Sequence, residues 1–358
     1  MSDIKVAAVT LMGQKHRQRG VPCEDSSLAL ERNGVHVVAI ADGAGSKQYT
    51  HARYGSECAV NAIADLLCDN FDVIYNENRE AAVRSLIIAA VHIRFADLLV
   101  EHKLDSIERL SCTLLFCAVK DRRMIIGHIG DGLIAKVSSS GISPLTMPQN
   151  DNAGKTYFVT AAHAGDYLRL IKTTTDDVHA VTLMTDGVQD SVYDENSGLV
   201  KPVVARMAET LQNGREESEK EITSIVEKYI VGASNNSDDS SFGVMLFSDT
   251  KAPDTSVFPS SAEAFPRTDK SFKDLQAELA PLVKKARNIM IQAKAVASPA
   301  ETEDSKSRTN ETDEAAEVTA SKMENISESA KRQSFLLYIL VAVETVAIIL
   351  LLLKIFFF

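Results

Sequence analysis

Short apolar runs of β type alternate with longer segments of helical spacing between residues 4 and 249. The clearest stretch is "SSLALERNGVHVVAIADG", in which two β-type runs flank Asn33-Gly34. This dipeptide is the strongest short-range signal for a hairpin with a two-residue type I′ turn. Counting outward from that turn pairs Asp25 with Asp42, with their Cβ atoms about 5 Å apart on one face of the sheet. The pattern therefore predicts a hairpin that sets two carboxylates opposite each other.

The rest of this region predicts further elements in the same way. Apolar residues at helical spacing predict helices over 47–70, 79–103, about 200–212 and 216–231. A second hairpin is predicted around Asp121-Arg122, a strand is predicted to end at Asp186, and a last strand follows Asp238. We interpret residues 1–250 as one domain.

The pattern changes after residue 250. Residues 251–268 are rich in Pro and Ser and are predicted to be a linker. Residues 269–297 are predicted to be a helical segment, which Pro281 kinks or splits, and which either packs on the domain or forms a partner helix. Residues 298–333 are rich in Glu, Ser, Thr and Ala without an apolar face, and are predicted to be a flexible charged tether.

The last segment, "FLLYILVAVETVAIILLLLKIFFF" over 335–358, is apolar apart from Glu344 and Lys354. At about 1.5 Å per residue it is long enough to cross a hydrocarbon core of roughly 30 Å. A buried core helix is the alternative, which the lack of a polar face disfavours. Lys331 and Arg332 precede the segment and favour a cytosolic start. We therefore expect a single-pass C-terminal membrane anchor with the preceding domain in the cytoplasm; Glu344 is either tolerated as a neutral carboxyl or contacts a partner helix.

Composition excludes several classes of function. The formal net charge is −11, which disfavours nucleic acid as a partner, since binding it requires a basic face. Five cysteines occur without CxxC spacing and without a histidine cluster. A zinc site is therefore disfavoured, and reduced thiols in a cytosolic compartment are expected.

Acidic residues gather at the predicted strand ends. Like charges that face each other across a sheet repel, and a cation between Asp25 and Asp42 would remove that penalty. Oxygen ligands suit hard cations such as Mg²⁺ or Mn²⁺ rather than zinc. A nucleotide-binding loop at "DGAGSKQYT" is the alternative, but neither GxxxxGK[ST] nor GxGxxG occurs there. The acidic residues concerned form three Asp-Gly pairs and one Asp-Asp pair: Asp42-Gly43, Asp131-Gly132, Asp186-Gly187 and Asp238-Asp239.

Six short motifs occur in an order that is similar to that of the metal-dependent serine/threonine protein phosphatases of the 2C type. The resemblance covers about residues 8 to 248 and is nearest to a bacterial-like branch whose first Asp motif reads Asp-Gly-Ala-Gly-Ser. It implies an α+β fold, a four-layer α-β-β-α sandwich with a metal site at one end of the sheets. The motifs are "CEDSS" (23–27), "ADGAGS" (41–46), "SCTLL" (111–115), "IGDG" (129–132), "TDGVQD" (185–190) and "SDDSS" (237–241).

By position, the resemblance assigns the metal site to Asp42, the Gly43 carbonyl, Asp186 and Asp238. Glu24 and Asp25 match residues that reach metal-bound waters or ligate directly, and Asp131 matches the position of a third, looser ion. The implied reaction is hydrolysis of phosphoserine or phosphothreonine by a water that two Mn²⁺ or Mg²⁺ ions activate, without a phosphoenzyme.

Two departures from the family pattern concern catalysis. Ala44 stands where the commoner motif has a histidine acid, so His16 or a metal-bound water is expected to protonate the leaving group. The arginine that grips phosphate is not at its usual spacing, which leaves His16, Arg17 and Arg19 as candidates. We therefore expect a phosphatase that acts on phosphoproteins at a membrane surface. The alternative is a catalytically weak or dead relative that serves as a membrane-tethered phosphopeptide-binding or scaffold module.

Overall fold

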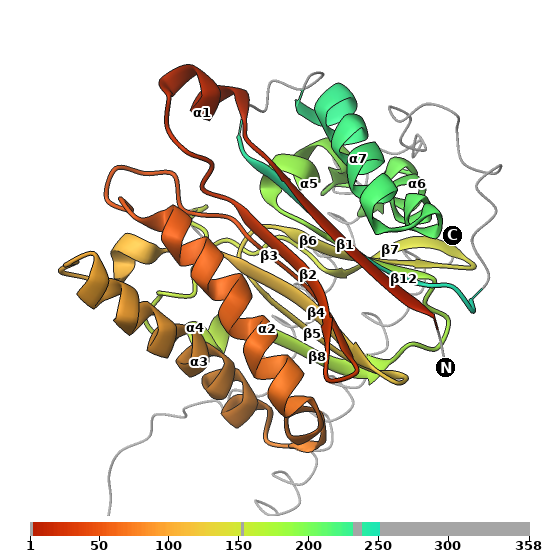
Figure 1. Cartoon of the computed structure of the whole chain (residues 1–358), viewed down its shortest axis with the longest axis horizontal. Helices are drawn as coiled ribbons and strands as arrows, with labels where there is room; N and C mark the ends of the chain where they lie inside the picture. Colours follow the sequence, from red (N-terminus) through yellow and green to blue (C-terminus); the bar gives the residue numbers. More distant parts are fainter. Residues whose placement is uncertain (1–2, 152–153, 232–237, 251–358) are drawn as a thin grey trace, which may run out of the picture. The chain divides into compact units, whose positions relative to one another are not determined.

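The computed structural model describes residues 3–151, 154–231 and 238–250, which form two five-stranded antiparallel sheets. The first sheet has the order β1-β12-β9-β6-β7 and the second the order β2-β3-β4-β5-β8 (Figure 1). In the first sheet the strands are β1 (Ile4–Leu11), β12 (Ser240–Phe247), β9 (Ala180–Met184), β6 (Leu133–Ser138) and β7 (Gly141–Thr146). In the second they are β2 (Ser26–Arg32), β3 (Val35–Ala41), β4 (Leu114–Lys120), β5 (Arg123–Ile129) and β8 (Arg169–Thr174).

Helices cover the outer face of each sheet (Figure 1). The long helices α2 (Ala52–Asn76) and α3 (Glu80–Glu101) lie on the second sheet, whereas α5 (Asp186–Val192), α6 (Val203–Glu209) and α7 (Arg215–Val226) lie on the first. The short elements are α1 (Gln14–Arg19), α4 (Ala164–Tyr167), η1 (Ile107–Leu110), η2 (Thr210–Asn213), η3 (Glu227–Val231), β10 (Tyr193–Asp194) and β11 (Leu199–Val200). The order of layers is thus helix, sheet, sheet, helix, as the resemblance in motif order implies.

Strand β3 shows why a continuous apolar run suits this arrangement. Val37 and Ala39 belong to the core under α2 and α3, whereas Val38 and Ile40 belong to the core between the sheets. Side chains of a strand alternate between its two faces, so a strand that is covered on both sides needs apolar residues at nearly every position. The sandwich therefore has three cores, the third lying between the first sheet and α5, α6 and α7.

The hairpin predicted around Asn33-Gly34 is confirmed. Both turn residues have positive φ, 56° and 72°, as a type I′ turn requires. Arg32 pairs with Val35, and the register continues without a shift to the pair Ser26 and Ala41. The next residues outward are Asp25 and Asp42, so both carboxylates leave the same end of the hairpin.

The second hairpin is confirmed as well, with Lys120 paired to Arg123. The helix predicted over 79–103 is α3. The helix predicted over 47–70 instead begins at Ala52. It is kinked at Asn70, whose φ of −131° and ψ of 18° are not helical, so the predicted end coincides with the kink, and α2 continues beyond it to Asn76. Tertiary contacts hold the preceding residues in a loop, since the Ala44 amide donates to the Ser111 carbonyl and the His51 amide donates to the Arg109 carbonyl, each at 3.0 Å.

The predictions for residues 251–358, from the linker to the membrane anchor, lie outside the described residues. Within the part of the chain that the structure does describe, no helix is both long and apolar enough to span a bilayer.

Candidate metal centre

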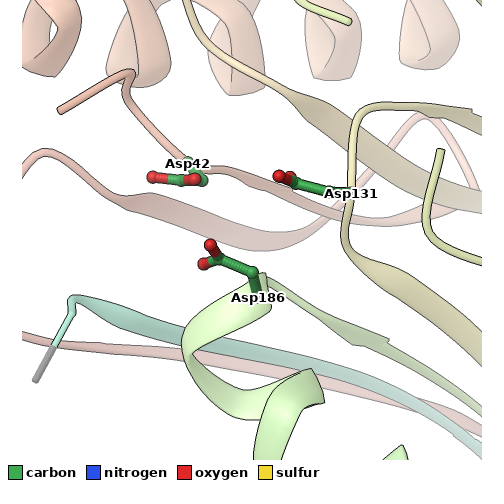
Figure 2. A group of neighbouring side chains, drawn as sticks. All are labelled: Asp42, Asp131 and Asp186. Carbon is green, nitrogen blue, oxygen red and sulfur yellow. The ribbon is translucent and has the colours of Figure 1, made fainter. Parts of the chain in front are cut away.

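Three carboxylates converge at one end of the sandwich: those of Asp42, Asp131 and Asp186 (Figure 2). Each offers one oxygen, and these oxygens all lie within 4.8 Å of one another. Asp42 directly follows β3, Asp131 lies between β5 and β6, and Asp186 begins α5. Both sheets therefore contribute to the cluster, and each contributing residue is one that the sequence singled out.

The glycines that follow these aspartates permit the close packing of the loops. A Cβ on Gly43 would lie 2.5 Å from the Glu24 carbonyl oxygen, and one on Gly132 would lie 2.4 Å from that of Met184. At Gly187 the distance to the Asp239 carbonyl oxygen would be 1.9 Å. None of these three glycines has a positive φ, so they serve close backbone approach rather than the sharp turn of a left-handed residue.

Asp25 lies beside this cluster and is almost fully buried. Its Oδ2 accepts hydrogen bonds from the hydroxyls of Thr185 and Ser241, both at 2.9 Å. Its Oδ1 is buried and accepts from no hydroxyl or amide among the described residues, and the side chain lies close enough to the Asp42 carboxyl to share a proton with it. Oδ1 of Asp131 is also buried and has no hydrogen-bond partner among these residues. Buried carboxylate oxygens without a partner are costly, because the charge has lost water and gained nothing in return.

The crowding of these carboxyls raises their pKa values. Burial is the largest cause in each case; it raises the pKa of Asp25 to about 7 and, with the charges of Asp131 and Asp25, that of Asp186 to about 8. Burial and the neighbouring charges of Asp25 and Asp186 also raise the pKa of Asp42 well above its usual value. Without a cation, the cluster therefore resists full ionisation near neutral pH.

The donor set fits a hard divalent cation. All the converging atoms are carboxylate oxygens, and among the described residues no histidine or cysteine belongs to this group. The buried Oδ1 of Asp131 has no hydrogen-bond partner in the same part of the chain. Mg²⁺ and Mn²⁺ prefer such oxygen ligands, whereas zinc favours nitrogen and sulfur. A bound cation would satisfy the free oxygens and remove the mutual repulsion.

Asp238 lies at the rim of the site. Its charge contributes to the raised pKa values of Asp186 and Asp131, and Lys15 Nζ lies 3.8 Å from its Oδ2. About 44% of its side chain is exposed, against 24% for Glu24. Asp238 does not belong to the group of three carboxylates that converges within 4.8 Å among the described residues.

Asp239, which the sequence analysis names in the Asp238-Asp239 pair without giving it a role, connects several segments of the site. Its Oδ1 accepts from the Gly13 amide at 2.7 Å, and its Oδ2 accepts from the Glu24 amide at 2.6 Å. His16 Nδ1 also lies 2.7 Å from Oδ2. One buried carboxylate thus holds both the loop before α1 and the loop that carries Glu24. The sequence did indicate this residue through the two consecutive aspartates of "SDDSS", but only the first of them, Asp238, was assigned a function.

The candidate phosphate-binding residues separate in the structure. His16 is buried between two carboxylates, with Nδ1 on Asp239 and Nε2 at 3.8 Å from Oε2 of Glu24. Arg17 lies on the surface of α1 and pairs with Glu227 at 3.7 Å, while Arg19 is exposed. His16 is therefore the one of the three that is built into the acidic centre.

Ala44 occupies a closed position. It is 5% exposed and contacts Tyr49, Ala52 and Phe158 in a small apolar cluster. The position at which the commoner motif has its histidine acid is thus filled by an apolar side chain in a packed cluster.

Comparison with known proteins supplies a family. A family model described as "Protein phosphatase 2C" matches residues 12–227. No curated protein sequence matches the chain.

Several solved structures are similar to the chain at low sequence identity. A bacterial serine phosphatase is 16% identical, with a TM-score of 0.47, over 70% of this chain and 100% of its own. The serine/threonine phosphatase PstP/Ppp of Mycobacterium tuberculosis is 17% identical, with a TM-score of 0.45, over 69% of this chain and 99% of its own. The catalytic domain of PstP in complex with two manganese ions is 18% identical, also with a TM-score of 0.45, over 69% and 99%. At these scores the family assignment rests on the sequence model.

Proposed function

The chain belongs to the protein phosphatase 2C family, that of serine/threonine protein phosphatases, and on this premise we propose that its acidic centre binds two Mn²⁺ or Mg²⁺ ions and hydrolyses phosphoserine and phosphothreonine on proteins. The observation that carries the proposal is the convergence of Asp42, Asp131 and Asp186 within 4.8 Å, together with a buried Asp131 oxygen that has no partner among the described residues. When bound, such ions supply Lewis acidity toward the phosphoryl oxygens and lower the pKa of a water.

The individual acidic residues have different roles in the proposed site. Asp42 and Asp186 hold the central position, since their carboxylates come from the two different sheets and meet there. Asp25 adds a buried carboxylate that Thr185 and Ser241 keep in one orientation. Asp238 is the further ligand on the solvent side, and Asp131 is the ligand of a third, looser ion.

His16 is a positioning residue in this scheme. Asp239 fixes its ring through Nδ1, so that Nε2 is directed at Glu24, which lies between the buried site and solvent. The same Asp239 carboxylate accepts the Glu24 amide hydrogen. The His16 ring and the Glu24 backbone are thereby held by one buried carboxylate beside the acidic centre.

Activity tests the proposal directly. The full chain is expected to hydrolyse a phosphoserine peptide with Mn²⁺ and to lose that activity with a chelator. Asp42→Asn and Asp186→Asn are each expected to reduce kcat/KM by about 100-fold or more, since each removes a charged ligand. Asp121→Asn is the matched control: Asp121 is exposed, and its φ of 57° suits asparagine. Full activity in Asp42→Asn would refute the assignment.

A binding module is the second candidate function, and the buried Ala44 is the observation that favours it. A chain without turnover would still offer a cationic metal centre to a phosphorylated peptide. Binding of a phosphopeptide in the presence of Mn²⁺, without any release of phosphate, would support this alternative over the enzyme.

We also propose that residues 335–358 anchor the domain to a membrane with the catalytic centre on the cytoplasmic side. The proposal rests on the apolar run and on Lys331 and Arg332 before it. The full chain is expected to stay with the membrane fraction after alkaline carbonate extraction, whereas a chain that ends at residue 333 is not. Release of the full chain by carbonate would contradict the anchor.

A further inference from the structure

Helix α3 carries a second apolar face that points away from the domain core. Its inner face packs on the second sheet and α2 through Val83, Ile87, Val91 and Phe95. Its outer face exposes three large apolar side chains: Leu86 is 46% exposed, Ile93 68% and Val100 81%. An exposed alanine precedes each of them along the helix: Ala82, Ala89 and Ala96. In Figure 1, α3 lies at the outer surface beside α2.

The six residues form one narrow stripe. Their spacing alternates strictly between four and three residues, which is the heptad pattern of helices that pack along their length. At about 100° per residue they fall within an arc of roughly 80°, centred opposite the buried face. A helix that packs on only one side has no need of such a stripe, and polar residues would be expected there.

Large and small residues alternate along the stripe in a way that is complementary to itself. If two copies of α3 lie antiparallel with a two-fold axis at the level of Val91, each large side chain meets an alanine of the other copy. Leu86 then faces Ala96, Ile93 faces Ala89 and Val100 faces Ala82. An isologous interface requires this self-complementarity, and the alanines allow the helix axes to approach to about 8 Å.

We propose that α3 is a self-association surface through which two copies of this chain pair antiparallel. The charges on the helix permit such a contact, because α3 and its N-cap Arg79 carry three acidic and three basic side chains, although the chain as a whole has a net charge of −11. A helix of 22 residues with a rise of about 1.5 Å per residue offers a contact about 10 Å wide along its length, so two such helices bury roughly 700 Å² in total. Stable interfaces begin at about 1,200 Å², so the dimer is weak and forms at micromolar or higher concentrations.

Sedimentation of the full chain in a mild detergent, over a range of concentrations, tests the proposal. The wild-type chain is expected to shift from monomer to dimer as its concentration rises. Ile93→Lys is expected to weaken this association by at least about tenfold, because it places a charge in a desolvated seam. Val73→Lys is the matched control, since Val73 has the same 68% exposure but lies on α2, outside the stripe. A wild-type chain that stays monomeric, or an equal effect of both variants, would overturn the proposal.

Exchanging the sizes of two facing side chains tests whether the partner of α3 is a second α3. Ala89→Ile alone sets two isoleucines against each other and is expected to weaken dimerisation by about tenfold. Combining Ala89→Ile with Ile93→Ala restores a large residue opposite a small one, and is expected to return the affinity to within about threefold of wild type. Both sites are exposed, so folding is not at risk. Failure of the double variant to recover would show that something other than a second α3 covers this face, and would end the proposal.

Discussion

Removing divalent cations is expected to make the stability of the domain fall as the pH rises, and this effect should depend on Asp186. Burial and neighbouring acids raise the folded-state pKa of Asp186 to about 8 and that of Asp25 to about 7, from the usual 3.8. The folded state thus keeps protons that the unfolded state has already released. The stability that these groups contribute is complete below about pH 4 and is lost as the pH rises through 7 and 8.

The magnitude follows from the same pKa values. Since one pKa unit corresponds to about 1.4 kcal/mol, Asp186 alone corresponds to up to about 6 kcal/mol between the two limits. The two carboxyls share one repulsion, so their contributions are not additive, and we expect a total change of several kcal/mol in the free energy of unfolding. For a domain of this size, about 1 kcal/mol shifts Tm by roughly 2–4 °C.

Thermal unfolding of the wild type and of Asp186→Asn, from about pH 5 to about pH 8, measures the effect. In a chelator, Tm of the wild type relative to Asp186→Asn should fall by about 5–10 °C as the pH rises. Mn²⁺ should recover that loss in the wild type and recover much less in the variant, because it replaces protons as the partner of the carboxylates. Comparison with the variant cancels groups such as histidines that titrate elsewhere. A difference between the two proteins that stays constant with pH, with no effect of Mn²⁺, would refute the idea of a repulsive acidic centre.

Three further predictions concern the surroundings of the site. In Asp239→Asn only one oxygen remains to accept from the Gly13 amide, the Glu24 amide and His16, which two oxygens now serve. We therefore expect kcat/KM to fall at least about tenfold and the free energy of unfolding to drop by about 1–3 kcal/mol. Unchanged values in kinetic and thermal assays would contradict this. Gly187→Ala would force a Cβ to 1.9 Å from a carbonyl oxygen and should lower Tm strongly, whereas Gly165→Ala, with its nearest contact at 3.7 Å, should not; equal Tm values would be inconsistent with the close approach. Burial holds the pKa of His128 well below 6.5, so its contribution to stability is present above that pH and is lost as the pH falls; His128→Gln should therefore flatten the acid side of the Tm profile, and an unaltered profile would count against it.

The parts of the fold that the sequence predicts best are those decided by local chemistry. Asn33-Gly34 favours a type I′ turn because both residues accept positive φ, and that preference alone sets the register of the whole hairpin. The opposition of Asp25 and Asp42 follows by counting. Helix α3 is predicted equally well, because apolar residues recur at helical spacing along its whole length.

The start of α2 and the role of Asp239 could not be predicted from local sequence in this way. Residues 47–51 are predicted to be helical, but the Ala44 amide before them and the His51 amide at their end donate to the carbonyls of Ser111 and Arg109, which are distant in sequence. Asp239 likewise acts through groups more than 200 residues away, the Gly13 and Glu24 amides and His16. Such partners become visible only when both sheets are assembled.

The acidic centre is a place where the fold works against its own stability. Four carboxyls with raised pKa values, those of Asp25, Asp42, Asp131 and Asp186, repel one another at the end of the sandwich. Their positions are fixed by contacts that do not depend on a cation: a hairpin of defined register, glycines under neighbouring backbone, and the Asp239 carboxylate across three segments. Because the three covered cores hold the strands, the strand ends can carry an unfavourable arrangement, which a divalent cation would convert into a favourable one. On the proposed function, such a pre-formed centre would bind its ions with little reorganisation, as phosphoryl hydrolysis requires.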